Sequence, residues 1–582
     1  MRRITVTRFR LLPFVTLITS LAAVTAGLSA NARSEAADTV YLGGDIVTMN
    51  PSQPSAEALA VKDGRVLAVG TDAGMKKHYK HAVTRIVDLQ GKTLLPGFLD
   101  AHSHYVQALT LPNQVNVYAP PAGTGKDVDS IVALLREFRD SRDIPPGELI
   151  QAYGYDDTVM PNGRLLNRDD LDKALPDNPV IVSHVSMHGA VFNSAALRRF
   201  NLSAATPTPE GGVIVREPGT NEPYGLIMET AYLPVFAQLP KPEAPALNAL
   251  STATQRIYAA NGYTTVHDGA THASELAIMQ DAAASGANII NIIAYPFITE
   301  LDAILQRNPA ATWGIYNQRL KIGGVKITID GSPQGRTAYF STPYLTGGPG
   351  GEQDWRGELT FPQGAINQMV KRVYDLGVPL NLHANGDAAI DSFLSAHENA
   401  AGAATGQDRN ITLIHSQFVR PDQLDKFVQY KVQPSLYTLH TFYFADAHMA
   451  NRGAEQAAYM SPMRDAIDRE LYPTNHTDYV VAPLDPMFML WSAVNRVSRS
   501  GQVVGPGQRV TPWEGLAAMT INVARQYDEL ASKGSLEAGK LADMVVLDRN
   551  PLKIDPQEIK DIQVLATLKE GVVIYPQGES LY

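Results

Sequence analysis

The chain has 582 residues, and its 45% hydrophobic and 19% charged content is that of an ordinary globular protein, which excludes a disordered or fibrous class. A net charge of −10 without basic clusters argues against nucleic acid as a partner, because binding nucleic acid requires basic patches. The absence of cysteine excludes a disulfide framework, a cysteine-ligated metal and a lipid-modified cysteine.

The first 32 residues are typical of a secretory signal peptide. Four arginines, at positions 2, 3, 8 and 10, precede an apolar stretch over residues 11–28. Ala30-Asn31-Ala32 then supplies the small-x-small pattern of a cleavage site. We expect residues 1–32 to be removed and the mature protein to be exported to the periplasm or the extracellular medium, without membrane attachment. A membrane anchor is the alternative, but threonine, serine and glycine dilute the apolar stretch.

Both ends of the mature chain show the short alternating patterns of β-strands. Residues 60–70 indicate a hairpin around Asp63-Gly64, and residues 88–95 continue the pattern. Residues 541–548, 564–568 and 571–575 are further short apolar runs. We predict a small β-sandwich domain formed from both chain ends, with residues 33–95 as its first part. Residues 511–582 would contribute the last helix of the central domain and the second part of the sandwich.

The body between these ends, residues 96–510, alternates helical stretches with brief apolar runs, the pattern of βα units around a parallel sheet. Many of the runs end in polar residues, as expected where strand ends carry a site. After the opening run at 94–99, the others lie at 180–184, 263–268, 324–330, 378–383, 411–415, 432–436 and 475–478. This makes about eight units, so we predict an α/β fold, a (β/α)₈ TIM-like barrel.

Two histidines follow the first of these runs at a spacing of two residues. On a strand, residues i and i+2 point to the same face, so His102 and His104 are expected to project together. Neutral imidazoles are common ligands of zinc and similar ions. His383 and His415 close later runs in the same way, Lys326 lies within a run, and Asp478 follows the last one. Together these residues predict a metal site at the strand ends.

Several motifs, in order along the chain, resemble those of the metal-dependent amidohydrolase superfamily. The branch most similar to this sequence includes N-substituted formamide deformylases and their exported relatives. The motifs are residues 95–104, residues 326–331 with 336–338, residues 383–390, residues 415–417 and residues 539–547. The resemblance covers nearly the whole mature chain.

The resemblance implies a role for each matching residue. His102 and His104 would bind a buried metal, His383 and His415 a second metal, and Lys326 would be carbamylated and bridge the two. Asp478 would also contact the metal and accept a proton from the attacking water. Without cysteine, nitrogen and oxygen donors suit zinc, with iron, manganese or nickel not excluded, as one or two ions.

Two assignments have alternatives. Relatives usually show a Ser-Asp-x-Pro pattern at the last strand, whereas here Asp478 follows Thr477 and Asp485 lies between prolines further on. We take Asp478, because Thr477 keeps the small hydroxyl before the aspartate. Lys326 would otherwise be a snorkelling lysine that pairs with Asp330.

The remaining predicted site residues are supporting ones. His188 resembles a residue in a loop that reaches the substrate, and it is assigned both a catalytic and a substrate-binding role; the alternative is a satisfied loop histidine. Arg336 and Asn385 are further substrate-binding candidates, and His267 and Asp268 are expected to orient ligands. Glu229 is expected to be structural, at the start of a helical segment.

The resemblance therefore implies a hydrolase that cleaves a non-peptide carbon–nitrogen bond, in an amide or a formamide-like compound. The same activated water could cleave an ester, a lactone or a cyclic amide, since pocket shape decides the substrate. A non-catalytic binding or regulatory protein on the same scaffold is a third reading. The expected partner is a small-molecule substrate, and self-association into a homo-oligomer is left open.

Overall fold

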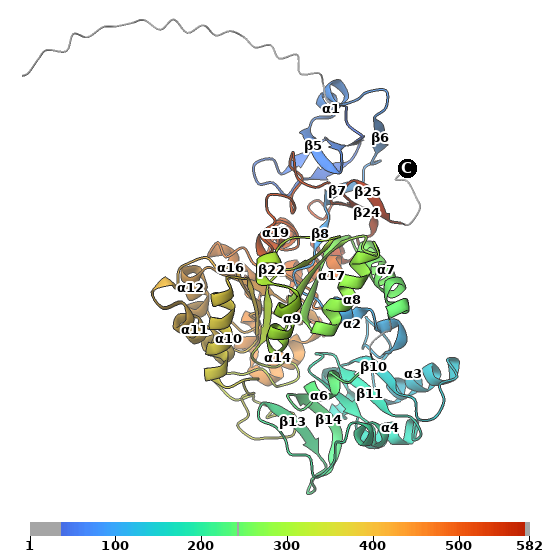
Figure 1. Cartoon of the computed structure of the whole chain (residues 1–582), viewed down its shortest axis with the longest axis vertical. Helices are drawn as coiled ribbons and strands as arrows, with labels where there is room; N and C mark the ends of the chain where they lie inside the picture. The colour runs from blue at the N-terminus through green and yellow to red at the C-terminus, as the bar shows by residue number, and fades with distance from the viewer. Residues whose placement is uncertain (1–35, 241–243, 577–582) are drawn as a thin grey trace, which may run out of the picture. The chain divides into compact units, whose positions relative to one another are not determined.

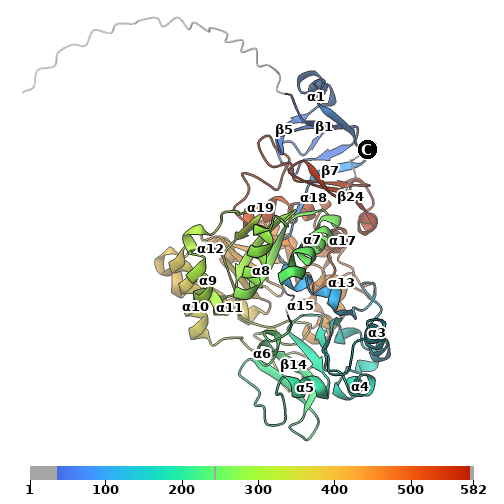
Figure 2. The same cartoon turned by 45° about the vertical axis from the view of Figure 1, so that its right-hand side comes forward.

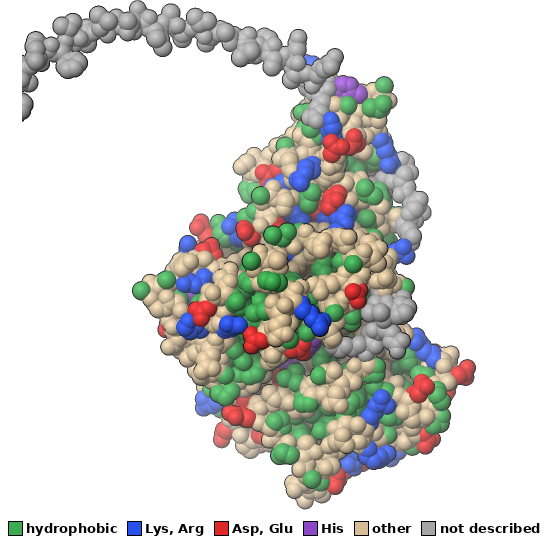
Figure 3. Space-filling view, in the orientation of Figure 1, with side chains coloured by type: hydrophobic (Ala, Val, Ile, Leu, Met, Phe, Trp, Pro, Cys, Tyr) green, Lys and Arg blue, Asp and Glu red, His purple; other side chains and the backbone are tan. Residues whose placement is uncertain are grey.

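The computed structural model of the protein describes residues 36–240 and 244–576. The predicted signal peptide, residues 1–32, lies outside the described residues, so its cleavage stays a prediction. Within the described ranges, no helix is both long and apolar enough to span a membrane. Acidic and basic side chains are interspersed over the face drawn in Figure 3.

Two parallel sheets carry most of the predicted barrel strands. One has the strand order β17-β16-β15-β8, and the other has the order β18-β19-β20-β21-β22. The strands are β8 (Phe98–Leu99), β15 (Tyr263–Thr271), β16 (Asn291–Pro296), β17 (Leu320–Ile322), β18 (Val325–Thr328), β19 (Leu380–Ala384), β20 (Ile411–His415), β21 (Val432–Leu436) and β22 (Thr474–Asn475). A parallel bridge between Phe297 and Lys326 joins the sheets on one side. On the other side, Asn475 N donates to Ala518 O and Leu99 N donates to Met519 O, each at 3.0 Å.

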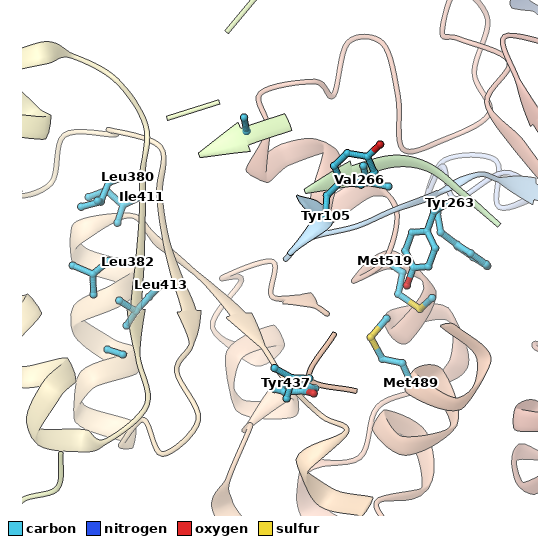
Figure 4. Close-up of a cluster of buried hydrophobic side chains, with 14 of the residues drawn as sticks. Tyr105, Tyr263, Val266, Leu380, Leu382, Ile411, Leu413, Tyr437, Met489 and Met519 are labelled. Carbon is cyan, nitrogen blue, oxygen red and sulfur yellow. The ribbon is translucent and has the colours of Figure 1, made fainter. Parts of the chain in front are cut away.

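Helices lie around these strands, as Figures 1 and 2 show. They include α7 (Ala244–Ala260), α8 (Ala273–Ala284), α10 (Gln363–Leu376), α11 (Asp387–Ala401) and α12 (Pro421–Tyr430). Leu380 and Leu382 of β19 pair in register with Ile411 and Leu413 of β20, and Figure 4 shows the four side chains beside one another. Because alternate residues of a strand point to opposite faces, His383 turns to the other face of β19.

A separate six-stranded mixed sheet lies between β8 and α7 in the sequence, with the order β13-β14-β12-β11-β10-β9. Its strands are β9 (Val115–Asn116), β10 (Ile150–Tyr155), β11 (Val180–His184), β12 (Gly189–Phe192), β13 (Gly212–Arg216) and β14 (Pro223–Glu229). The assignment of residues 180–184 to the barrel is therefore wrong, since β11 pairs antiparallel with β12. β16, which the sequence pattern did not single out, pairs in parallel with β15 and β17 instead.

Strands from the two chain ends pair directly. The sheet β25-β24-β23-β7-β2-β3 joins β2 (Asp45–Val47), β3 (Ser55–Ala56) and β7 (Thr93–Pro96) to β23 (Met544–Leu547), β24 (Val564–Lys569) and β25 (Val572–Tyr575). β7 is antiparallel to β23, with Leu95 opposite Val545, and in Figure 1 the blue β7 lies beside the red β24 and β25.

A second sheet at the N-terminal end has the order β5-β4-β1-β6. It contains β1 (Thr39–Leu42), β4 (Ala58–Lys62), β5 (Arg65–Gly70) and β6 (Arg85–Asp88). The predicted hairpin is confirmed, because β4 and β5 are antiparallel neighbours. Tyr41 and Leu59 of this sheet share one buried cluster with Leu94, Val546 and Leu568 of the other.

Candidate metal centre

His102 and His104 follow β8 and lie between the parallel strands and the next helix. They converge, with ring centroids 5.2 Å apart, but the expected reason is wrong, because β8 ends at Leu99 and neither histidine lies on a strand. The backbone of His104 instead forms an isolated antiparallel β-bridge with that of Asp268 in β15. His104 Nδ1 lies 2.9 Å from Gly269 O. Since a carbonyl only accepts hydrogen bonds, Nδ1 carries the proton and Nε2 carries a lone pair.

Asp478 brings a carboxylate to these imidazoles. Its Oδ1 lies 3.4 Å from His102 Nε2 and 3.3 Å from His104 Nε2, and its Oδ2 lies 3.9 Å from His415 Nε2. The backbone of Asp478 has φ +52°, an unusual conformation for an aspartate that turns the chain just after β22. Within the described residues, buried Oδ1 has no hydrogen-bond partner.

These atoms fit a cation. His104 Nε2 and Asp478 Oδ1 face each other at 3.3 Å, a contact that is favourable only when a cation, either a proton or a metal ion, lies between the two atoms. Tetrahedral ligands about 2.0–2.1 Å from zinc are about 3.3–3.4 Å apart, and the two separations from Asp478 Oδ1 are 3.4 and 3.3 Å. His102, His415 and Asp478 also offer ligand atoms that all lie within 4.8 Å of one another.

His415 reaches the site through an irregular backbone. Leu413 of β20 points towards the helices, and His415 is two residues further along the chain. In a regular strand, His415 would therefore point to the helices as well and away from the site. A φ of +70° at His415, followed by +43° at Ser416, ends this alternation. The ring of His415 consequently lies 4.6 Å from that of His383 and 5.6 Å from that of His102. Such backbone conformations are stored where the surrounding structure enforces them, often at functional sites.

His383 offers its Nδ1 to this site. Its Nε2 lies 3.3 Å from Asp330 Oδ1 and 3.0 Å from Asn385 Nδ2. Asp330 also accepts from the backbone NH groups of Asn385 and Gly386, both at 2.9 Å, so its position is fixed. With Nε2–H donating to Asp330, the lone pair of His383 is on Nδ1.

Lys326 is buried on β18, and its Nζ lies 3.2 Å from His102 Nε2. The alternative in which Lys326 pairs with Asp330 does not match this contact. Burial is the main cause that lowers the pKa of Lys326, to about 8, with Asp478 acting in the opposite direction. Together with His102, His104, His383, His415 and Asp478, Lys326 completes the set of six predicted residues, and the structure brings all six together.

The charge states suit metal binding. Burial, and then the charge of Lys326, lowers the pKa of His102 well below its usual range. Burial and the neighbouring imidazoles of His383 and His476 do the same for the pKa of His415. Burial alone would raise the pKa of Asp478, but contact with His104 and the charge of Lys326 lower it to about 2. Neutral imidazoles and an ionised carboxylate are the forms that coordinate a metal.

His188 comes from the six-stranded sheet, at the turn before β12. Its Nδ1 lies 3.0 Å from Glu229 Oε2, and Glu229 N donates to His188 O at 2.7 Å. Its ring is 5.3 Å from that of His383. Burial would lower the pKa of His188, but the Glu229 carboxylate raises it. Glu229 is therefore the last residue of β14 and the partner of His188, not the start of a helix.

The other predicted residues lie at varying distances from this centre. His267 donates from Nδ1 to Ala101 O at 2.9 Å, and Asp268 accepts from Val106 N at 2.9 Å, so both tie down the segment that carries His102 and His104. Asn385 also donates to Gly331 O at 2.9 Å. Arg336 is half-buried in the loop after β18 and has a φ of +61°.

Asp485, the rival of Asp478, caps a helix instead. Its side chain accepts from Phe488 N at 2.9 Å, at the start of α17 (Pro486–Asn495). Three residues around the centre were not predicted from the sequence to be site residues: His476, Asp330 and Glu229. His476 was detectable, since it precedes Asp478 by two residues, the same spacing as in the first histidine pair.

The chain is similar to known proteins over most of its length. The amidohydrolase family matches residues 85–575. The chain is 26% identical over 552 residues to an N-substituted formamide deformylase of Arthrobacter pascens, covering 93% of this chain and 99% of that protein. It is 27% identical over 557 residues to the protein LONG AFTER FAR-RED 3 of Arabidopsis thaliana, covering 93% of this chain and 92% of the relative.

Among solved structures, an uncharacterised metal-dependent hydrolase of Pyrococcus horikoshii superposes with a TM-score of 0.70 at 24% identity, covering 89% of this chain and 99% of that one. This likeness shows that the two share a fold. The family match extends over most of the chain and includes every residue of the candidate centre. The chain therefore belongs to the amidohydrolase family and is a metal-dependent hydrolase that acts on carbon–nitrogen bonds.

Proposed function

We propose that the protein cleaves a non-peptide amide or formamide-like bond in a small molecule, and that Asp478 is the proton acceptor. The observation that carries this proposal is the buried Oδ1 of Asp478, which faces imidazole nitrogens of His102 and His104 at 3.4 and 3.3 Å. The similarity to a formamide deformylase supports a formamide-like substrate.

The residues that would hold a metal are those whose nitrogen and oxygen ligand atoms converge at the centre. His102 Nε2, His104 Nε2 and Asp478 Oδ1 would bind one ion, and His383 Nδ1 with His415 Nε2 a second. Zinc is the proposed ion, because the donors are nitrogen and oxygen. When bound, such an ion lowers the pKa of water from about 15.7 towards about 7 and polarises a carbonyl.

Lys326 is proposed to be carbamylated by carbon dioxide and to bridge two ions. Its pKa of about 8 supports this, since about a tenth of such an amine is neutral at pH 7. The neutral amine would attack the carbon of carbon dioxide and release one proton to solvent, which leaves an anionic carbamate.

The protein's own groups would then move the proton. Asp478, ionised at neutral pH, takes a proton from the attacking water and delivers it to the departing amine. His188, whose Nδ1–H donates to Glu229, would in its protonated form donate from Nε2 to the substrate carbonyl oxygen, and the Glu229 carboxylate favours that form by raising the pKa of His188. Arg336 would meet a substrate carboxylate, and Asn385, held by its hydrogen bond to Gly331 O at 2.9 Å, would contact the substrate.

The architecture proposed for this site is a closed (β/α)₈ barrel over residues 96–510, carried by a sandwich of residues 33–95 and 511–582. The Phe297–Lys326 bridge and the bonds of Asn475 and Leu99 to residues 518 and 519 support closure. The shared cluster of both chain ends supports the sandwich. Export after removal of residues 1–32 remains part of the proposal.

The test is a metal analysis of the purified mature protein, followed by hydrolysis assays on simple amides and N-formyl amines with that metal restored. We expect metal-dependent release of the amine. Cleavage of esters, lactones or cyclic amides alone would favour the alternative substrates. A metal-loaded protein that cleaves none of these compounds would instead favour a binding or regulatory role.

A further inference from the structure

His476, which no part of the proposed mechanism uses, lies directly behind the candidate ligand His415. Its Nε2 is 3.1 Å from His415 Nδ1, and its Nδ1 is 2.9 Å from Ser435 Oγ. All three side chains are buried, with 1% of His476, 5% of His415 and none of Ser435 exposed. The ring of His476 also lies 5.3 Å from that of His102.

The tautomers of this chain of three residues depend on one another. If His415 binds a metal through Nε2, its proton must be on Nδ1, and this N–H then donates to His476 Nε2. His476 Nε2 can accept only when its own proton is on Nδ1, and that N–H donates to Ser435 Oγ. The hydroxyl of Ser435 can accept as well as donate, so it supports this tautomer of His476 by accepting from Nδ1–H, and His476 Nε2 in turn accepts from His415.

The arrangement differs from that of His104 and His383. His104 Nδ1 donates to a backbone carbonyl and His383 Nε2 to a carboxylate, both of which are acceptors only. Metal-binding histidines generally use such partners to fix their orientation. His415 has a neutral imidazole instead, which accepts a hydrogen bond in only one of its tautomers.

We infer that His476 is a positioning residue for the metal, which holds His415 in its metal-binding tautomer while Ser435 accepts from the Nδ1–H of His476. The inference rests on the proposed function, because it presumes that His415 is a ligand. It assigns to His476 an effect on metal affinity, transmitted through a hydrogen bond, without direct contact with the substrate.

The experiment measures the zinc dissociation constant of the metal-free mature protein by competition with a chromophoric chelator. In His476→Leu the acceptor is lost, and we expect the dissociation constant to rise about 10- to 100-fold, the usual effect of removing a partner of a metal ligand. In His476→Gln the side-chain oxygen can still accept from His415 Nδ1–H, so affinity should return to within about threefold of wild type. Ser435→Ala should lie between these two variants.

The control is His397→Leu, which also removes a buried imidazole. His397 lies on α11 and bonds to Tyr374 Oη at 2.7 Å and to Thr405 O at 3.0 Å. Neither partner belongs to the candidate metal centre, so zinc affinity should not change. Wild-type affinity in His476→Leu would overturn the inference, as would a His476→Gln variant as weak as His476→Leu. Should His476→Leu fail to fold, the other two variants decide. The inference then requires a small loss of zinc affinity in His476→Gln and a larger loss in Ser435→Ala. Wild-type zinc affinity in Ser435→Ala would contradict it. Failure of the wild-type protein to bind zinc would refute the proposed site instead.

Discussion

Replacement of Asp478 by asparagine separates proton transfer from metal binding. The side chain keeps its shape and an oxygen that can face His102 and His104, but it cannot take a proton from water. Because a positioned base contributes about 10²–10⁴-fold, kcat should fall by that factor, which corresponds to about 2.7–5.4 kcal/mol of transition-state free energy. Asp478 has a pKa of about 2, so the wild-type carboxylate is ionised throughout the neutral range and the loss should be constant there. Metal content should stay nearly intact.

Steady-state kinetics and metal analysis on the same sample provide the assay, and Asp485→Asn is the matched control. Asp485 caps α17 by accepting from Phe488 N at 2.9 Å, and asparagine caps helices about as well as aspartate. This control should therefore change neither kcat nor thermal stability. If Asp485→Asn abolishes turnover while Asp478→Asn remains active, the base has been misassigned. His383→Ala or His415→Ala should lower metal content as well as kcat, because a ligand is removed.

Three further outcomes are expected. Glu529 lies between Lys321 and Lys533, at 2.5 and 2.7 Å; burial would raise its pKa, but the two ammonium groups lower it from 4.5 to about 2. The ionised form therefore stabilises the fold above the unfolded-state pKa, by about 3 kcal/mol, and this contribution is lost as the pH falls from about 4.5 to about 2. Denaturant unfolding of Glu529→Gln should show a loss of that size at pH 7 that shrinks towards pH 2, and an equal loss at both pH values would contradict it. Gly269→Ala would place a Cβ 2.5 Å from His102 Cε1, so zinc should bind about 10- to 100-fold more weakly, whereas Gly364→Ala, with no atom within 4 Å of its new Cβ, should leave zinc binding unchanged. Removal of the metal with a chelator should abolish hydrolysis and lower the melting temperature, since a ligand present at 1,000 times its dissociation constant contributes about 4 kcal/mol; activity that survives complete metal removal would refute metal dependence.

The residues that the sequence predicted well are those whose local pattern and structural role coincide. His383 and His415 end apolar runs that are β19 and β20, and the pairing of the two chain ends follows from short β patterns at both termini. Lys326 is buried within a strand, which was recognisable as an unusual place for a charge.

The residues that were missed or misplaced depend on tertiary pairing. The run at β11 is apolar and ends in a histidine, like a barrel strand, and only its antiparallel partner β12 shows that it belongs to another sheet. Glu229 is 41 residues from His188, and the β12–β14 pairing brings them together. The left-handed backbone at His415 and Asp478, which aims both side chains, has no signature in residue type. A buried fully apolar run does not reveal its sheet, because strands buried on both faces have no alternation.

The most direct test of the central claim is anomalous diffraction from crystals of the zinc-loaded protein. We predict a peak within about 2.0–2.3 Å of Asp478 Oδ1, His102 Nε2 and His104 Nε2. In the same crystals, a second peak, if two ions bind, should lie beside His383 Nδ1 and His415 Nε2. A catalytically active, zinc-loaded crystal whose only strong peak lies away from Asp478 would contradict the account.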